Sequence, residues 1–337
     1  MKQKLPFLIF ETTSICNLNC KYCYNIWKRP GVEDVSKNSY KQARKTLKRF
    51  FSMADVEQVT FTGGEPFLAE RFSELVLYAR MKKKQVSIIS NGNKASKEDY
   101  KTMISLGVNL FEFPILSYDE NVHDGLTQMK GSWQKVIRSV KEVLELKGNI
   151  VAVIVITKHN YLHIDKTLAF IKELGLSRVM LNRYNIGGTG IKFLKELATT
   201  KEELNRAFAL ANIAGKELNM ILSFNVCTPL CLLSSKDHKN IMFTSCSSSI
   251  LNKPLTLDIE GNMRICNHSP IVIGNIYKNS IEEIINSPYN QQWVDIVPDF
   301  CKGCEIFDKC LGGCRAASEQ MNLGLEHVDP ILTLDKN

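Results

Sequence analysis

The chain has 337 residues, 44% of them hydrophobic, which allows a sizeable core and room for a barrel-type domain with a smaller second one. No apolar run is long enough to span a bilayer, and the N-terminus lacks a signal-peptide segment. We therefore expect a soluble, cytoplasmic protein with no membrane partner. The formal net charge of +8, from 43 basic and 35 acidic residues, is modest and argues against nucleic-acid binding.

Short β-like runs alternate with amphipathic helical patterns along the chain up to residue 224. Six such units predict an α/β fold with a parallel sheet, open or curled into a partial (β/α)6 barrel. In such folds, functional residues gather at the C-terminal ends of the strands. The predicted strands are 5–11, 56–62, 86–90, 110–116, 150–156 and 179–184, and the predicted helices are 39–51, 69–81, 97–106, 133–146, 165–174 and 201–218.

We expect this core to occupy residues 1–224 and a loop-rich, Cys-rich extension to occupy residues 225–337, where the periodicity weakens. Within the extension, a β-hairpin is predicted over residues 254–266. The chain holds 11 cysteines, and in a reducing compartment this count favours metal or cluster ligation over disulfide bonds.

Three cysteines, Cys16, Cys20 and Cys23, come directly after the first predicted strand. Thiolates at this spacing can bind three irons of a [4Fe–4S] cube and leave the fourth iron open to a ligand. The same spacing also fits one face of an α-helix, where cysteine packs as a small apolar residue. The asparagine and lysine residues between the thiols favour a loop.

A second motif, Gly63-Gly64-Glu65-Pro66, follows the strand predicted over residues 56–62. Its glycines allow backbone groups to approach a ligand closely, and Pro66 is suited to open a helix. Alone, the motif is also explained as a strand-to-helix turn. Together with the cysteine spacing it resembles the radical S-adenosylmethionine (SAM) superfamily, in which the open iron binds the amino and carboxylate groups of SAM and the glycine motif binds the methionyl amine.

The resemblance implies that an electron donor of the flavodoxin or ferredoxin type reduces the cluster, that SAM is cleaved, and that a 5′-deoxyadenosyl radical takes a hydrogen from the substrate. An Arg often found near the SAM carboxylate is replaced here by Thr127 or a neighbour, which leaves Lys130 or Arg183 as alternatives. Each further residue expected to contact SAM is equally explained as a turn or core residue. These residues are Tyr22, Ser90, Asn91, Ser117 and Thr157.

The cysteines of the extension resemble the SPASM domain of peptide-modifying radical SAM enzymes. By this resemblance, Cys246, Cys266 and Cys314 hold auxiliary cluster I, with Cys231 or Cys227 as the fourth ligand. A second auxiliary [4Fe–4S] cluster, cluster II, is then held by three further cysteines. These are Cys301, Cys304 and Cys310.

The extension departs from the family pattern in one respect, because no cysteine follows Cys314. Cluster II then uses a ligand such as His327 or Asp329, keeps an open iron, or is missing. Four of the cysteines also match a tetrahedral zinc site. A sulfatase-maturing enzyme would carry an Asp base directly after the hairpin cysteine, whereas Asn267 stands here. His268 is the alternative candidate base, although a lone histidine is more often structural.

The leading hypothesis is a radical SAM/SPASM enzyme that installs an oxidative cross-link or dehydrogenation in a peptide or protein. The chain starts close to its first strand, so we expect a separate leader-recognition protein or leader-independent binding. One alternative is the maturation of a small cofactor, such as a haem-pathway decarboxylation. A non-catalytic Fe–S or zinc module is another, but it does not explain Gly63-Gly64-Glu65-Pro66.

Overall fold

The structure is a computed structural model that describes residues 2–30, 39–244, 246–247 and 249–334. Its main feature is an 11-stranded sheet, which curls through the molecule in the order β10-β9-β8-β7-β6-β5-β4-β1-β11-β12-β13. Neighbouring strands from β10 to β11 are parallel, and the last two pairs are antiparallel. The strands are β1 (Gln3–Glu11), β4 (Ala54–Thr62), β5 (Gln85–Ile89), β6 (Leu110–Pro114), β7 (Ile150–Ile156), β8 (Arg178–Arg183), β9 (Ile221–Phe224), β10 (Ile241–Phe243), β11 (Leu255–Asp258), β12 (Asn262–Arg264) and β13 (Val272–Asn275), with β2 (Ile15–Cys16) and β3 (Arg29–Pro30) forming a separate small sheet.

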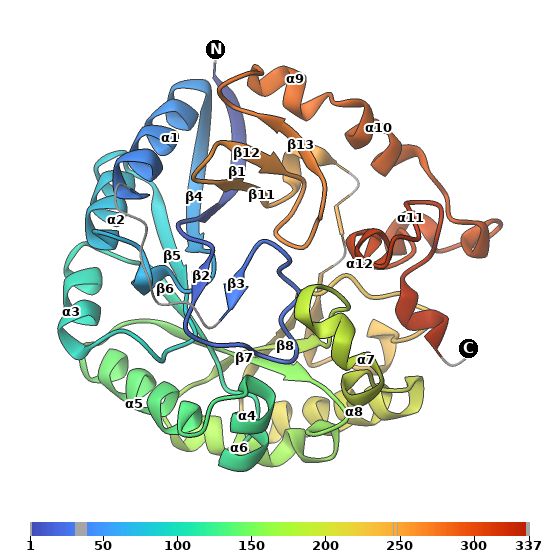
Figure 1. The fold of residues 1–337 in the computed structure, drawn as a ribbon. Helices are drawn as coiled ribbons and strands as arrows, with labels where there is room; N and C mark the ends of the chain where they lie inside the picture. The colour runs from blue at the N-terminus through green and yellow to red at the C-terminus, as the bar shows by residue number, and fades with distance from the viewer. Residues whose placement is uncertain (1, 31–38, 245, 248, 335–337) are drawn as a thin grey trace.

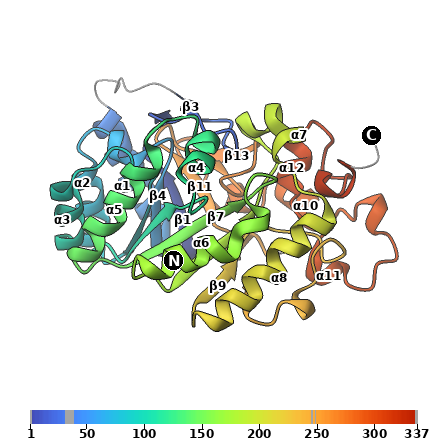
Figure 2. The same ribbon diagram turned by 90° about the horizontal axis from the view of Figure 1, so that it is seen from below.

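Helices cover the outer face of the sheet, and Figure 1 shows α1, α2, α3, α5, α6 and α8 as a ring around the strands. Seen from below in Figure 2, β3, α4 and α7 lie along one edge of the molecule. These segments follow the C-terminal ends of β1, β6 and β8. The helices are α1 (Ser39–Met53), α2 (Phe72–Met81), α3 (Lys97–Ser105), α4 (Glu120–Thr127), α5 (Ser132–Glu145), α6 (Ile164–Glu173), α7 (Leu194–Leu197), α8 (Lys201–Glu217), α9 (Ile281–Ile285), α10 (Pro288–Asp295), α11 (Phe307–Cys310) and α12 (Arg315–Gln320).

Successive side chains of a strand point to opposite faces of the sheet, so one set packs under the outer helices and the other faces the inside of the barrel. On β6, the fully buried Phe111 and Phe113 pack outward on Tyr100 of α3, with ring centroids 5.8 and 5.9 Å apart. Glu112 between them therefore faces inward. None of the helices in the described part of the chain has the length and apolar character that a membrane crossing needs.

The six predicted strands and the helices around them are confirmed, with boundaries that shift by a few residues. Two short parallel strands, β9 and β10, were not predicted, and they extend the sheet past β8. The predicted hairpin is also confirmed, but it adds to the sheet itself, because β11 pairs with β1. The sheet thus runs across the expected boundary at residue 224, and the division into two domains stays a prediction.

Buried polar contacts tie the extension to the barrel. The Arg264 guanidinium on β12 pairs with the Glu11 carboxylate at the end of β1, and both side chains are buried. On the outer side, Thr46 Oγ1 of α1 donates to the Ile259 carbonyl oxygen at 2.6 Å. The hairpin of the extension is therefore fixed relative to the first strand.

Candidate functional site

Cys16 ends β2, and Cys20 and Cys23 lie on the loop that follows it. Residues 17–28 contain turns but no helix, so the alternative in which the cysteines share one helix face is wrong. Cys16 and Cys20 are buried and Cys23 is half-buried. Tyr22 packs against Cys16 and Cys20, and its contact with the cofactor stays a prediction.

Lys28 places a positive charge beside the three thiols. Lys28 Nζ lies 3.6 Å from Cys23 Sγ, and although burial disfavours the ammonium charge, the three cysteines together raise the pKa of Lys28. Burial raises the pKa of Cys16, and it raises that of Cys20 to about 12. Buried thiols deprotonate when they bind a metal. Three convergent thiols with a neighbouring cation fit the ligand set of an anionic iron–sulfur cluster, and Lys28 was not predicted.

The glycine motif is docked on the backbone that leads into the cysteine loop. Gly64 N donates to the Thr13 carbonyl oxygen at 2.7 Å, and Glu65 N donates to that of Ile15 at 2.8 Å. A Cβ on Gly64 would lie 1.9 Å from the Ile15 oxygen, and Gly63 has φ of +139°. The glycines are required for this approach of two backbones, whatever they also contribute to a ligand.

Glu65 joins the motif to the end of β5. Its fully buried carboxylate accepts hydrogen bonds from Ser90 Oγ at 2.9 Å, Asn91 N at 2.8 Å and Phe67 N at 3.2 Å. Burial raises the pKa of Glu65 to about 7. Asn91 Nδ2 lies 3.7 Å from Cys16 Sγ. Residues predicted separately on three segments are therefore brought together beside the first cysteine.

Ser117 and Thr157 lie at the next two strand ends and are both buried. Asn160 connects them, since its Oδ1 accepts from Thr157 N at 2.8 Å and its Nδ2 donates to the Leu116 carbonyl oxygen at 2.8 Å. The segment after Ser117 reaches the cysteine loop through α4, where the Leu126 carbonyl oxygen accepts from Lys21 N at 2.9 Å. Their contacts with SAM stay a prediction.

The two cations proposed for the SAM carboxylate occupy different surroundings. Lys130 is exposed, whereas Arg183 is buried and pairs with Asp329. The charge of Arg183 is thus already balanced, whereas Lys28 on the cysteine loop lies beside Cys23.

Glu112 is a site residue that the sequence reading missed. It faces the inside of the barrel between Ile89 and Val151 on the neighbouring strands, and burial raises its pKa to about 7. Burial is the main cause that raises the pKa of Tyr24, the residue after Cys23, and the charge of Glu112 adds a smaller contribution. The signal was available, because a lone carboxylate between two phenylalanines of a buried strand is uncommon.

A second group of thiols forms where the β9–β10 loop meets the hairpin and the C-terminal helices. A hydrogen bond between Cys227 and Cys246 raises the pKa of the first and lowers that of the second. Lys253 Nζ, 2.8 Å from Cys246 Sγ, also favours the Cys246 thiolate. Burial raises the pKa of Cys266 and Cys314, with smaller contributions from Cys246 and Cys266, respectively. Of the two residues left open as fourth member, Cys227 lies with this group.

A third group contains Cys301 and Cys304, which precede α11, and Cys310, which ends it. Burial raises the pKa of Cys301 to about 11. The charges of Cys310, Cys304 and Cys231 contribute in the same direction. Cys231 thus lies with this group, and Cys310 and Cys304 in turn contribute to raising its pKa after burial.

In the described parts of the chain, no three Cys, His, Asp or Glu side chains are grouped to hold a single metal ion. The thiolates of a [4Fe–4S] cube bind different irons and are therefore farther apart than the ligands of one tetrahedral zinc ion.

His268 is buried between the cysteine loop and the second thiol group. Its Nε2 lies 2.9 Å from the Ile186 carbonyl oxygen, and its Nδ1 lies 3.1 Å from Cys314 Sγ. Its ring meets that of Tyr24 edge-on, with centroids 5.1 Å apart. Burial lowers the pKa of His268 to about 3, so the ring is neutral. These contacts favour a structural role over that of a catalytic base.

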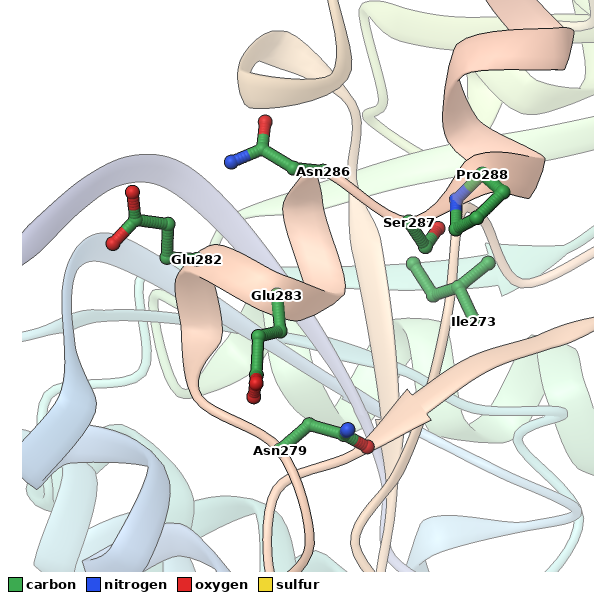
Figure 3. Close-up of a pocket in the computed structure, with 7 residues that line it drawn as sticks. All are labelled: Ile273, Asn279, Glu282, Glu283, Asn286, Ser287 and Pro288. Atoms are coloured by element: carbon green, nitrogen blue, oxygen red, sulfur yellow. The ribbon is translucent and has the colours of Figure 1, made fainter.

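A hollow of about 550 Å³ lies on α9 and the start of α10. Figure 3 shows Glu282, Glu283 and Asn279 around it, and none of its lining residues is a cysteine. It is separate from the site described above.

Comparison with known proteins decides the family. The model of the radical SAM superfamily matches residues 10–182, and the SPASM model, an iron–sulfur cluster-binding domain, matches residues 246–305. The chain belongs to the radical SAM superfamily. This membership supports an enzyme role and confirms SAM and [4Fe–4S] clusters as the cofactors that its residues fit.

Two curated relatives align with most of this radical SAM chain. The antilisterial bacteriocin subtilosin biosynthesis protein AlbA of Bacillus subtilis (strain 168) is 28% identical over 320 residues, which are 90% of this chain and 66% of AlbA. This chain therefore spans about two thirds of AlbA. The PqqA peptide cyclase of Granulibacter bethesdensis is 20% identical over 338 residues, which are 97% of this chain and 87% of the cyclase.

Solved structures share the fold. The structure of anSMEcpe with bound AdoMet and Cp18Cys peptide has a TM-score of 0.73 at 18% identity, covering 99% of this chain and 95% of that one. The structure of Streptococcus suis SuiB bound to precursor peptide SuiA has a TM-score of 0.74 at 17% identity. The alignment covers 96% of this chain and 75% of SuiB. The partial barrel with a C-terminal extension is thus confirmed.

The docking of the glycine motif yields a first prediction. Gly64→Ala should force the two backbones apart and lower the iron content of the reconstituted protein by about four per chain, since only the core cluster is lost. Gly125→Ala on α4 is the matched control, because its Cβ would meet nothing within 4 Å. Iron analysis under anaerobic conditions measures both, and a full iron content in Gly64→Ala would contradict the argument.

The half-buried carboxylate of Glu112, which faces the inside of the barrel, yields a second prediction. Because the folded-state pKa of about 7 exceeds the ordinary value of 4.5, the carboxyl group becomes more destabilising as pH rises from about 4.5 to about 7. Glu112→Gln should therefore stabilise the protein roughly 1 kcal/mol more at about pH 8.5 than at about pH 6.

Anaerobic urea unfolding at the two pH values measures this difference. The exposed Glu57→Gln on β4 is the control and should show none. An equal effect of both substitutions at both pH values would show that Glu112 is not desolvated.

Proposed function

We propose that this chain uses SAM to oxidise a peptide or protein, forming a cross-link or a dehydrogenated residue. The observation that carries the proposal is the short path between the cysteine loop and the second thiol group. Tyr24, next to Cys23, meets His268, and His268 contacts Cys314. A substrate held at the barrel mouth would lie near both groups.

When bound, the core cluster and SAM supply a 5′-deoxyadenosyl radical that takes one hydrogen atom from the substrate. To give an oxidised product, the substrate must then lose one electron and one proton. An auxiliary iron–sulfur cluster, held by cysteines of the extension, would accept that electron, since thiolate-bound iron exchanges single electrons. In total the substrate loses two hydrogens for each SAM cleaved, and one of them ends in 5′-deoxyadenosine.

The chain's own residues supply position, charge and exclusion of water. The docked glycine motif and Glu65 hold the strand ends around Cys16, while Lys28 offsets the charge of the thiolates. Glu112 inside the barrel has a pKa near neutrality, which suits it to accept the proton that the substrate loses.

The relatives support a peptide as the substrate. AlbA acts in the biosynthesis of a bacteriocin, the Granulibacter enzyme is named a cyclase of the PqqA peptide, and anSMEcpe and SuiB were each solved with a bound peptide. For this chain we propose a ribosomal peptide, presented directly or by a separate leader-recognition protein. The electron donor that reduces the core cluster is proposed to be of the flavodoxin or ferredoxin type.

The proposal predicts that Cys266→Ala still forms 5′-deoxyadenosine but yields no oxidised product, because the electron acceptor is lost. Mass spectrometry of short peptides encoded beside the gene for this chain should show a loss of about two mass units per modification with the unaltered enzyme. Ile271→Ala, exposed in the same extension, is the control and should keep the coupling. A redox-neutral product, such as an epimer with solvent deuterium at one carbon, would contradict the oxidative reaction.

A further inference from the structure

The loop between β9 and β10 carries two cysteines that face different groups. Cys227 shares a hydrogen bond with Cys246 of the second thiol group. Cys231, four residues further on, is exposed and has Cys310 and Cys304 as its charged neighbours. A single short segment therefore reaches both sets of cysteines.

Backbone geometry fixes the position of Cys231. Leu230 N donates to Cys310 Sγ at 3.3 Å, so the residue before Cys231 already contacts a cysteine of the third group. Pro229 packs against Gly313, where a Cβ would lie 2.7 Å from the proline ring. Leu232 N closes a turn onto the Pro229 carbonyl oxygen at 2.9 Å. Cys231 is thereby held beside α11.

A buried ion pair anchors the other end of the loop. Arg183 donates from Nη2 to the Cys227 carbonyl oxygen at 2.9 Å and from Nε to Thr228 Oγ1 at 2.8 Å, and it pairs with Asp329. Asp329 also accepts from Cys314 N at 2.8 Å. Since these contacts occupy the Asp329 carboxylate, it is not free to act as a ligand of the third group.

We propose that Cys231 is the fourth thiolate of the iron–sulfur site formed with Cys301, Cys304 and Cys310. This assignment accounts for the lack of any cysteine after Cys314, because the ligand comes from upstream in the chain. With four protein thiolates the cluster has no open iron, which fits a role in electron exchange and not in binding a substrate. The inference rests on the iron–sulfur cofactors of the family and not on the oxidative reaction.

The assignment of Cys231 is tested by iron analysis and EPR spectroscopy of the reconstituted full chain. SAM is present to cover the open iron of the core cluster. Cys231→Ala should lower the iron content from about 12 to about eight, or give a three-iron signal after mild oxidation that the unaltered protein lacks. Cys304→Ala should behave alike, and the double variant should lose no more than about four irons. The isosteric Cys231→Ser, measured in parallel, should show the same defect if the alanine variant fails to fold.

His327→Ala is the matched control for the alternative ligand and should keep about 12 irons. The proposal is overturned if both Cys231 variants keep all irons without a three-iron signal, or if the losses in Cys231→Ala and Cys304→Ala add. None of these readouts depends on product formation, so they stay valid if the proposed oxidation is wrong.

Discussion

The contact on which the site depends is the close approach of two backbones, from Gly63 to Glu65 and from Thr13 to Ile15. It holds because Gly64 has no side chain, since a Cβ there would overlap the Ile15 carbonyl oxygen. Through it the end of β4 fixes the start of the cysteine loop, and the Glu65 carboxylate extends the connection to β5. Three strand ends thus act as one rigid support for the first cysteines.

A second constraint is electrostatic. The chain buries many thiols, and burial alone raises their pKa values and keeps them protonated. Lys28 beside Cys23 and Lys253 beside Cys246 counter this effect locally. Such cations make a buried site suitable for a negatively charged cluster. Each lysine lies a few residues along the chain from its cysteine, so the segment that positions the thiol also positions the positive charge.

Local patterns were enough to predict the barrel and its two main motifs. The alternating strands, the cysteine spacing and Gly63–Pro66 each reflect short-range requirements that a sequence displays directly. The partners of the cysteines in the extension were not predictable, because Cys227 and Cys231 are four residues apart yet face different groups. Only tertiary packing, through Arg183 and Leu230, separates them. The pairing of β11 with β1 likewise depends on contacts between distant segments.

The central claim is that Cys16, Cys20 and Cys23 hold the cluster that cleaves SAM. It is tested most directly by measuring 5′-deoxyadenosine from SAM and dithionite with the reconstituted protein and with a variant in which all three cysteines are alanine. The account predicts that the variant forms no 5′-deoxyadenosine while it keeps about eight irons in its auxiliary clusters. Continued SAM cleavage by that variant would contradict the assignment.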